Sequence, residues 1–264
     1  MKERGYKPGF SASLLATAGV IGSIIPPSMV MIVYGSMAEV SVGGLFLAGI
    51  IPGLLIVGGL MGTIYMHSFS KRFPELKVTT GKFNLKAVLK STARVWVALV
   101  APVIVLGGIL GGVFTATEAG VVACVYSFIV SFFIYRAVSW KELPGMLVNG
   151  AVTTAMVVGI ISVAGAFGWL LTYLDFNDLV MDFVMGISDN PKVVLFALIL
   201  IMLFLTMFVE SLAILIILIP VIVEVAQRFG FDQYHFGMLM IMATQIGATT
   251  PPVAVGLFVA TSIA

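Results

Sequence analysis

Two stretches of the sequence place the same backbone chemistry inside long apolar runs. "GSIIPP" begins at Gly22 and "GATTPP" begins at Gly247, so each reads Gly-x-x-x-Pro-Pro. Proline has no N–H, and two adjacent prolines therefore leave preceding carbonyl groups without helical partners. In the hydrocarbon core of a membrane, an unpaired carbonyl group costs free energy unless it accepts a hydrogen bond or binds a ligand. Free carbonyl and hydroxyl oxygens are the ligands that a small hard cation such as Na⁺ prefers.

We call the two Gly-x-x-x-Pro-Pro stretches, 22–27 and 247–252, the first and the second break of a helix. The residue types around them define candidate sites for a cation and for a polar ligand. The candidate cation ligands are Gly22, Ser23, Pro26, Gly247, Thr250 and Pro251. The candidate substrate-binding residues are Ser28, Glu210, Ser211 and Thr249. The simpler interpretation is two plain proline kinks, which are common in membrane helices. Glu210 stays open between a cation ligand or pocket residue and a carboxylate that reaches water.

Composition places these breaks in a membrane. The 264 residues are 60% hydrophobic and 10% charged, whereas soluble domains are about 45–50% apolar and about 25% charged. We therefore expect an all-α integral membrane protein that has the lipid bilayer as a partner. The sequence has no Walker-type phosphate loop and no grouped nucleophile and base. It predicts neither an enzyme nor a nucleic-acid-binding protein.

The apolar segments must position the two breaks. The first broken helix is expected over 10–38 and the second over 234–264. A span over 43–66 follows the first. The remaining elements are expected at 95–113, 119–135 and 146–174, followed by an apolar stretch over 193–223.

Charges between the spans give an orientation. Segment 67–94 carries seven basic residues against Glu75 alone, whereas 175–190 carries four aspartates. The positive-inside rule therefore places 67–94 in the cytoplasm and 175–190 outside. The segment 10–38 then runs outward and 234–264 runs inward.

The stretch 193–223 is too short for two crossings, which need roughly 40 residues. Its centre is "FVES", which contains Glu210. The pattern favours a re-entrant hairpin with its tip near Glu210 and Ser211. One long tilted helix is the alternative, and it would place Glu210 in the bilayer and reverse the direction of 234–264.

A shift of 225 positions superimposes Gly22 on Gly247 and Pro26 on Pro251. Eight of the 35 residues over 5–39 are identical under this shift, so the spacing rather than the identity carries the similarity. With opposite directions, the copies form an inverted-topology repeat, as in many secondary transporters. The expected organisation is an incomplete first repeat over 1–66, a basic cytoplasmic linker over 67–94, and a second repeat over 95–264.

The first copy lacks a hairpin and the second lacks a final span. We therefore expect an internal portion of a longer protein.

Three stretches carry a resemblance to a known family. They are "GYKPGFSASLLATAGVIGSIIPPSMVMIVYGSMAEVSVGGLFLAGIIPGLL", "GGVFTATEAGVVACVYS" and "HFGMLMIMATQIGATTPPVAVGLFVA". They resemble the large membrane subunit of tripartite ATP-independent periplasmic (TRAP) transporters, and the resemblance covers essentially the whole chain. "KFNLKAVLKSTA" over 82–93 also resembles the interfacial arm helices of that family.

The resemblance implies a fold and a function. The fold is an elevator-type ion transporter, and the function is Na⁺-coupled uptake of small organic acids of the dicarboxylate, sialic acid or sugar-acid type. The partners are a small four-helix membrane subunit and a periplasmic substrate-binding protein, and the location is the bacterial inner membrane. Na⁺ sites are implied at the breaks over 22–27 and 247–252 and at the hairpin tip over 207–211. The alternative is a stand-alone Na⁺/carboxylate symporter without a binding protein, and the sequence does not name the substrate.

The charge pattern yields a direct prediction of orientation. We expect a cysteine introduced at Lys77 to be labelled from the cytoplasm, and cysteines within 175–190 to be labelled from outside in intact cells. The physical reason is the excess of basic residues in the first segment. Labelling of position 77 from outside would contradict the inverted repeat as well as the orientation.

Overall fold

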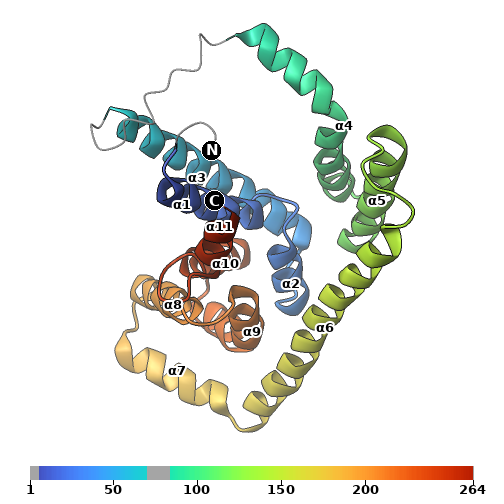
Figure 1. The fold of residues 1–264 in the computed structure, drawn as a ribbon. Helices are drawn as coiled ribbons and strands as arrows, with labels where there is room; N and C mark the ends of the chain where they lie inside the picture. Colours follow the sequence, from blue (N-terminus) through green and yellow to red (C-terminus); the bar gives the residue numbers. More distant parts are fainter. Residues whose placement is uncertain (1–5, 70–83, 264) are drawn as a thin grey trace. The chain divides into compact units, whose positions relative to one another are not determined.

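The computed structural model describes residues 6–69 and 84–263, and in these ranges the chain is helical and contains no strand (Figure 1). The basic segment 70–83 lies outside the described residues, and with it half of the expected linker over 67–94 and the first two residues of the expected arm helix over 82–93. The helices are α1 (Pro8–Ile24), α2 (Met29–Met37), α3 (Val42–Ser68), α4 (Leu85–Leu110), α5 (Ala116–Ile129), the π-helix η3 (Val130–Ile134), α6 (Leu143–Tyr173), α7 (Phe176–Ile187), α8 (Pro191–Thr206), α9 (Ser211–Arg228), α10 (Gln233–Gly247) and α11 (Val255–Ile263).

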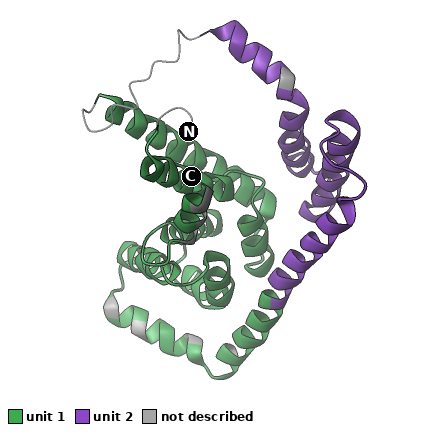
Figure 2. Cartoon of the chain, in the orientation of Figure 1, with its two compact units in different colours: residues 1–77, 160–264 green, residues 78–159 purple. Residues whose placement is uncertain are grey.

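The chain divides into two compact units (Figure 2). Unit 1 comprises residues 1–77 and 160–264, and unit 2 comprises residues 78–159. This division follows packing, whereas the division expected from the repeat follows the order of spans along the chain. Both broken helices and the hairpin segment fall in unit 1.

Both expected broken helices are interrupted at their proline pairs. The helices α1 and α2 are bent by 43° across the residues that contain Pro26 and Pro27. The helices α10 and α11 are separated by residues 248–254, which contain Pro251 and Pro252. The helix α10 begins 225 positions after α1, and α11 begins 226 positions after α2. The spacing seen in the sequence is therefore reproduced in the helix boundaries.

The segment 193–223 forms two helices rather than one long helix. The helix α8 ends at Thr206 and α9 begins at Ser211, and the two pack against each other. Both also pack against α10 (Figure 1). The interior of unit 1 lies here, and its completely buried side chains include Met202 on α8, Leu215 and Ile216 on α9, and Met240 and Ile241 on α10.

The helix α3 approaches the first break closely through a glycine. A Cβ added at Gly49 would lie 2.8 Å from the carbonyl oxygen of Ile24, the last residue of α1, and 2.6 Å from the methyl group of Met31. The absence of a side chain therefore lets α3 pack directly on the backbone where the first helix ends. Gly58, further along α3, has no described atom within 4 Å of such a Cβ.

Unit 2 contains α4, α5, η3 and the first half of α6. The helix α4 has two parts, over 85–93 and 95–110, that are bent relative to each other. The first part is the described portion of the expected arm helix. Thr115 and Glu118 form a capping box that starts α5, and the Tyr126 hydroxyl donates a hydrogen bond to the Val97 carbonyl of α4. This bond ties the two helices together.

The helix α7 lies in the acidic segment 175–190, for which the sequence predicted an orientation but no helix. Phe176, Val180 and Val184 recur every four residues and line an apolar pocket with α8 and α9. Asp178 and Asp182 lie on a different part of the helix and line a polar pocket with residues of α9. The four-residue apolar period was the signal that could have revealed this helix.

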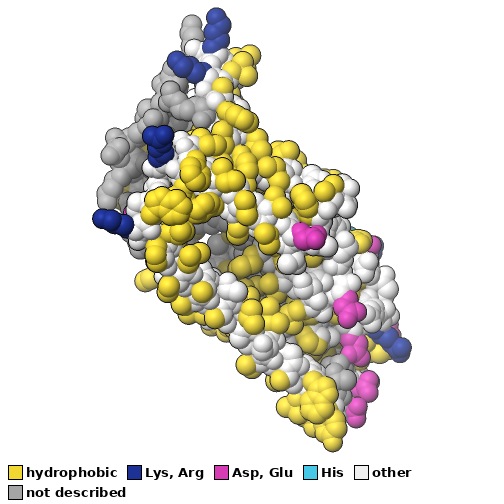
Figure 3. Space-filling model, turned by 90° about the vertical axis from the view of Figure 1, so that its right-hand side faces the viewer, with side chains coloured by type: hydrophobic (Ala, Val, Ile, Leu, Met, Phe, Trp, Pro, Cys, Tyr) yellow, Lys and Arg dark blue, Asp and Glu magenta, His cyan; other side chains and the backbone are white. Residues whose placement is uncertain are grey.

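The surface carries many apolar side chains. Figure 3 shows a face on which hydrophobic side chains cover much of the area. Within the described residues, four helices are long and apolar enough to cross a membrane, or up to seven spans if each bent helix pair is counted as one. Exposed apolar side chains over such helices are what contact with lipid requires.

The packing of α3 yields a stability prediction with a matched control. We expect Gly49→Ala to destabilise the complete protein by about 1–3 kcal/mol, because the new methyl group meets a backbone carbonyl that cannot rotate away. Gly58→Ala on the same helix should be neutral or slightly stabilising, because alanine is the better helix former. Thermal unfolding of both variants in detergent tests this. Equal melting temperatures for the two would show that the close approach at Gly49 does not hold the break in place.

Candidate functional site

At the first break, a side-chain hydroxyl replaces one of the backbone hydrogen bonds that the two prolines remove. Pro26 and Pro27 lack N–H groups, so the carbonyls of Gly22 and Ser23, four residues earlier, lose their helical donors. The Ser28 hydroxyl donates to the Ser23 carbonyl oxygen at 2.5 Å and accepts from the Met31 N–H at 3.4 Å. Ser28 is 2% exposed. It therefore satisfies one freed carbonyl and caps α2 at the same time.

The carbonyl of Gly22 is the other group that loses its helical donor at the first break. Among the described residues no hydrogen bond reaches it, because the Ile25 N–H donates to the Ile21 carbonyl instead. This oxygen is a ready acceptor or ligand at the end of α1. Gly22 makes no close packing contact with the described residues, since a Cβ added there would meet no atom within 4 Å.

The second break satisfies its freed carbonyls through the backbone. Here the affected groups are the carbonyls of Gly247 and Ala248, which accept from the Thr250 N–H at 2.9 Å and the Gly256 N–H at 3.4 Å. The Thr249 and Thr250 hydroxyls both donate to the Ile246 carbonyl, at 2.9 and 2.8 Å. Because a hydroxyl oxygen that donates one bond keeps lone pairs, both threonines remain able to act as ligands.

The tip of the hairpin, residues 207–211, is organised by a cap. The Glu210 carboxylate accepts from the Ala213 N–H at 2.8 Å and thereby starts α9. The neighbouring Ser211 hydroxyl donates to the same carboxylate at 3.4 Å. Glu210 itself is exposed, whereas Ser211 is 8% exposed. The cap gives Glu210 a structural role whether or not it binds a ligand.

The hairpin tip is joined to the second break by direct contacts. The Val253 N–H in the break donates to the Met207 carbonyl at the tip, at 3.1 Å. The Gln245 side-chain amide on α10 donates to the Ser211 hydroxyl at 3.4 Å. These bonds connect residues that lie more than 30 positions apart in the sequence.

Gly247 lies where α8 crosses α10. A Cβ at Gly247 would lie 2.5 Å from the Leu203 carbonyl oxygen and closer still to the hydroxyl oxygen of Thr206. Only glycine permits this approach. The close approach at Gly247 is therefore made by α8, the first helix of the hairpin.

A pocket of about 460 Å³ lies between α1, α10 and α11. Its polar lining comes from both breaks, through Ser23 near the first and Gln245 and Thr249 near the second. The other residues that line it are Leu15, Ala16, Gly19, Val20, Ala248, Gly256 and Ala260. Among the described residues, no charged side chain lines this pocket. The structure thus places one hydroxyl-bearing residue from each break on the same cavity.

The candidate residues divide into those that converge and those that do not. Ser23 and Thr249 share the pocket, and Ser211 contacts Gln245, which lines the same pocket. Ser28 and Pro26 are buried within the first break, and Pro251 is exposed. Gln245 and Thr206 were missed, because nothing in a sequence marks which face of a helix a distant hairpin will meet. A buried-type position occupied by glutamine in an apolar helix was the available signal for Gln245.

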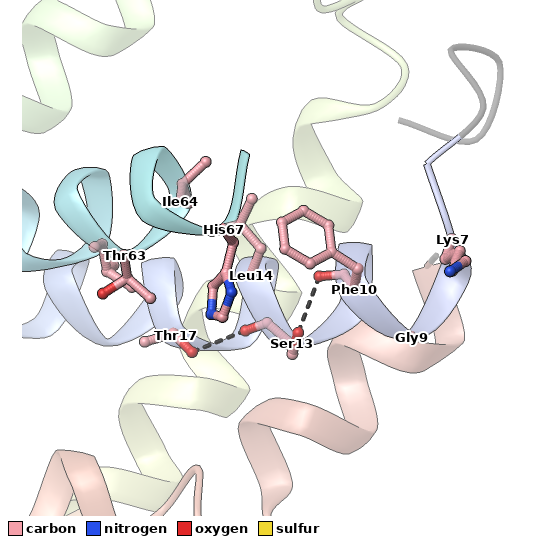
Figure 4. A pocket seen from close by; sticks show the side chains of 10 residues that line it. Lys7, Gly9, Phe10, Ser13, Leu14, Thr17, Thr63, Ile64 and His67 are labelled. Carbon is pink, nitrogen blue, oxygen red and sulfur yellow. Dashed lines mark hydrogen bonds between the residues drawn. The ribbon is translucent and has the colours of Figure 1, made fainter. Parts of the chain in front are cut away.

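A second, larger pocket of about 540 Å³ lies between α1 and α3 (Figure 4). Its lining includes Lys7 and His67, which lie apart from each other in Figure 4. The Ser13 hydroxyl donates to the Phe10 carbonyl and the Thr17 hydroxyl to the Ser13 carbonyl, within their own helix. None of the ten residues lining it belongs to a break or to the hairpin tip. This pocket is therefore separate from the candidate site.

Broken apolar helices around a neutral polar pocket are the construction of membrane transport proteins, and the described helices define a multi-pass membrane protein of this class. The sequence profile of the tripartite ATP-independent periplasmic transporter, DctM component, matches residues 1–264. The chain therefore belongs to this family, which is a family of transport permeases and not of enzymes.

Individual relatives agree with this assignment. The isethionate TRAP transporter permease of Oleidesulfovibrio alaskensis is 38% identical over 264 residues, which cover all of this chain and 41% of the relative. The sialic acid TRAP transporter large permease of Vibrio cholerae is 35% identical, and the C4-dicarboxylate TRAP transporter large permease of Pseudomonas aeruginosa is 36% identical. For each of these two, the match covers all of this chain and 61% of the relative. The chain thus spans about two fifths to three fifths of the relatives it matches.

The first break yields a prediction that separates its two roles. We expect Ser28→Ala to cost about 1–3 kcal/mol, because it removes a helix cap and also leaves the partly buried Ser23 carbonyl unpaired. Ser41→Ala removes only the exposed cap of α3, which accepts from the Gly44 N–H, and should cost about 0.5–1 kcal/mol. Thermal unfolding of the two variants measures the difference. Equal losses would mean that the bond to Ser23 contributes nothing to stability.

Proposed function

We propose that the complete protein containing this chain imports small organic acids by Na⁺-coupled secondary transport across the bacterial inner membrane. A periplasmic substrate-binding protein delivers the acid, and a small four-helix membrane subunit completes the complex. The observation that carries this proposal is the joining of the hairpin tip to the second break beside a neutral pocket lined from both breaks.

The names of the relatives support the substrate class. The three relatives described above are named for isethionate, sialic acid and C4-dicarboxylates. These are small anions that differ in size and in hydroxyl content. The shared property is negative charge, so we propose a small organic anion as the substrate of this transporter, of the dicarboxylate, sialic acid or sugar-acid type.

The chemistry of the breaks supports a hard monovalent cation as the coupling ion. Within 6–69 and 84–263 there is no group of three or more His, Cys, Asp or Glu side chains that could hold a metal. The breaks instead offer carbonyl oxygens at Gly22, Gly247 and neighbouring residues and the hydroxyl of Thr250. Neutral oxygens of this kind suit Na⁺ and disfavour transition metals.

The neutral lining gives a physical reason for coupling. An anion placed in a cavity without charged side chains lacks a partner, and burying an unpaired charge is costly. A bound cation is then the largest local positive charge and stabilises the anion. Each ion therefore binds better in the presence of the other, which couples their movement.

The repeat supports an alternating-access mechanism. If α1–α2 and α10–α11 cross the membrane in opposite directions, the two breaks are related by an axis in the membrane plane. The helices α8 and α9 would then enter and leave the membrane on the same side. In this proposal the hairpin and the broken helices move together as an elevator-type unit relative to the remaining spans.

A stand-alone Na⁺/carboxylate symporter is the alternative. It would use the same breaks and the same pocket, and it would need no soluble partner. The two functions differ in one observable, which is the requirement for a periplasmic binding protein.

The test is uptake by the complete transporter in proteoliposomes. Succinate, N-acetylneuraminate and isethionate would be supplied in turn, with and without the cognate binding protein and with NaCl or choline chloride outside. We expect uptake of at least one acid to require both the binding protein and Na⁺. Full-rate uptake without the binding protein would favour the stand-alone symporter, and uptake driven by a proton gradient without Na⁺ would overturn the cation assignment.

In the same assay, Thr250→Val tests the second break. The change keeps the side-chain shape but removes one neutral oxygen, which costs about 1–3 kcal/mol of cation binding. We expect the half-saturating Na⁺ concentration to rise roughly tenfold to a hundredfold. Thr261→Val is the matched control, because Thr261 makes the same kind of bond to a carbonyl within its own helix but lies on α11 away from the break. An unchanged Na⁺ dependence in well-folded Thr250→Val would remove this hydroxyl from the site.

A further inference from the structure

Gln245 is a buried polar side chain in the last turns of an apolar helix. It is 7% exposed, and its amide N–H donates to the Ser211 hydroxyl, which is itself 8% exposed. Burying an amide carries a penalty unless its atoms are paired. A glutamine at such a position therefore calls for a reason beyond packing.

The repeat shows that packing does not require this glutamine. Under the shift of 225 positions, Gln245 corresponds to Val20 in the first broken helix. Val20 is also buried and lines the same pocket. An apolar side chain thus serves at the equivalent place, and the polar side chain is specific to the copy that contacts the hairpin tip.

The hydrogen bonds around Ser211 form a directed chain. The Ser211 hydroxyl accepts from Gln245 and donates to the Glu210 carboxylate, which in turn accepts from the Ala213 N–H. The single proton of the hydroxyl is used toward Glu210, so its oxygen is free to accept from Gln245. The amide of α10 is thereby connected to the cap that begins α9.

Gln245, which lines the pocket, also has unused hydrogen-bonding capacity. A carboxamide has two N–H donors and an oxygen with two lone pairs, and among the described residues it makes one hydrogen bond. Of the other polar residues that line the pocket, Thr249 donates its hydroxyl proton to the Ile246 carbonyl, and Ser23 accepts from Ser28 through its main-chain carbonyl. Neither is bonded to the hairpin tip by a hydrogen bond of the described residues. Gln245 is therefore the lining side chain that can both hold the tip and offer a donor and an acceptor to a ligand.

We propose that Gln245 is a positioning residue that holds the hairpin tip against the second break through Ser211 and presents the rest of its amide to the polar groups of the transported anion. The holding role is independent of the transported species. The second role rests on the proposed function of the pocket.

The holding role is tested by the accessibility of a buried thiol. Thr206 is 2% exposed and packs against Gly247, so a thiol introduced by Thr206→Cys reacts with a maleimide only when the hairpin moves away from α10. The complete transporter would be used after replacement of its other cysteines, which in this chain means Cys124→Ala. We expect Gln245→Met, which keeps the length of the side chain, to speed labelling about three- to tenfold. Labelling of this kind reports the population of the opened state.

Two further variants decide the interpretation. Ser211→Ala should speed labelling to the same extent, and combining it with Gln245→Met should add nothing, because both changes remove the same bond. Gln233→Met is the matched control on the same helix, at an exposed position, and should leave the rate within about twofold. An unchanged rate in Gln245→Met, or additive effects of the two changes, would overturn the holding role.

The pocket role is tested by uptake at saturating Na⁺, with succinate, N-acetylneuraminate and isethionate as probes. We expect Gln245→Met to raise the half-saturating acid concentration about tenfold and Ser211→Ala to raise it less, because only the first change removes pocket-facing atoms. Equal effects of the two variants, or a shift in Na⁺ dependence alone, would overturn the pocket role. If the parent protein transports none of the probes, the proposed function fails, and the thiol labelling still decides whether Gln245 holds the tip.

Discussion

Unit 1 depends on one constraint: four backbone carbonyl groups in an apolar environment need hydrogen-bond partners. The two proline pairs deprive Gly22, Ser23, Gly247 and Ala248 of their helical donors, and hydrocarbon supplies no substitute. Three of these carbonyls accept hydrogen bonds from residues that follow them: Ser28, Thr250 and Gly256. The fourth, at Gly22, meets no donor among the described residues. Each break is therefore a turn with its own hydrogen bonds, not a local disorder of a helix.

Such turns stay in place only if neighbouring helices pack on them closely. Gly49 lets α3 rest on the end of α1, and Gly247 lets α8 cross α10 at the second break. In both places the contacted atoms include a backbone carbonyl oxygen, which cannot rotate out of the way. The two glycines thus allow neighbouring helices to pack tightly where the broken helices are interrupted. Because α8 packs on α10 at Gly247, the hairpin tip lies at the second break.

The pocket between the breaks lies beside these tightly packed helices and is lined by uncharged polar residues as well as apolar ones. Its polar lining residues are Ser23, Gln245 and Thr249, and no charged residue contributes to the lining. An anion in such a cavity is stabilised by hydrogen bonds and by a cation bound nearby, rather than by a fixed arginine or lysine. This arrangement lets the proposed Na⁺ and the acid depend on each other, which a permanently charged site would not require.

The sequence by itself determined the membrane class, the positions of both broken helices and their spacing of 225 residues, because composition, hydropathy and proline chemistry are local properties. The family followed from the resemblance of three stretches to known relatives. The sequence favoured a hairpin over one long helix for 193–223, and it missed the amphipathic helix α7. Only the tertiary structure decided that Ser211 meets Gln245, that Gly247 accommodates Thr206, and that Ser23 and Thr249 line one cavity. These are contacts between helices far apart in the chain, and their partners depend on which faces pack together, which no local pattern specifies.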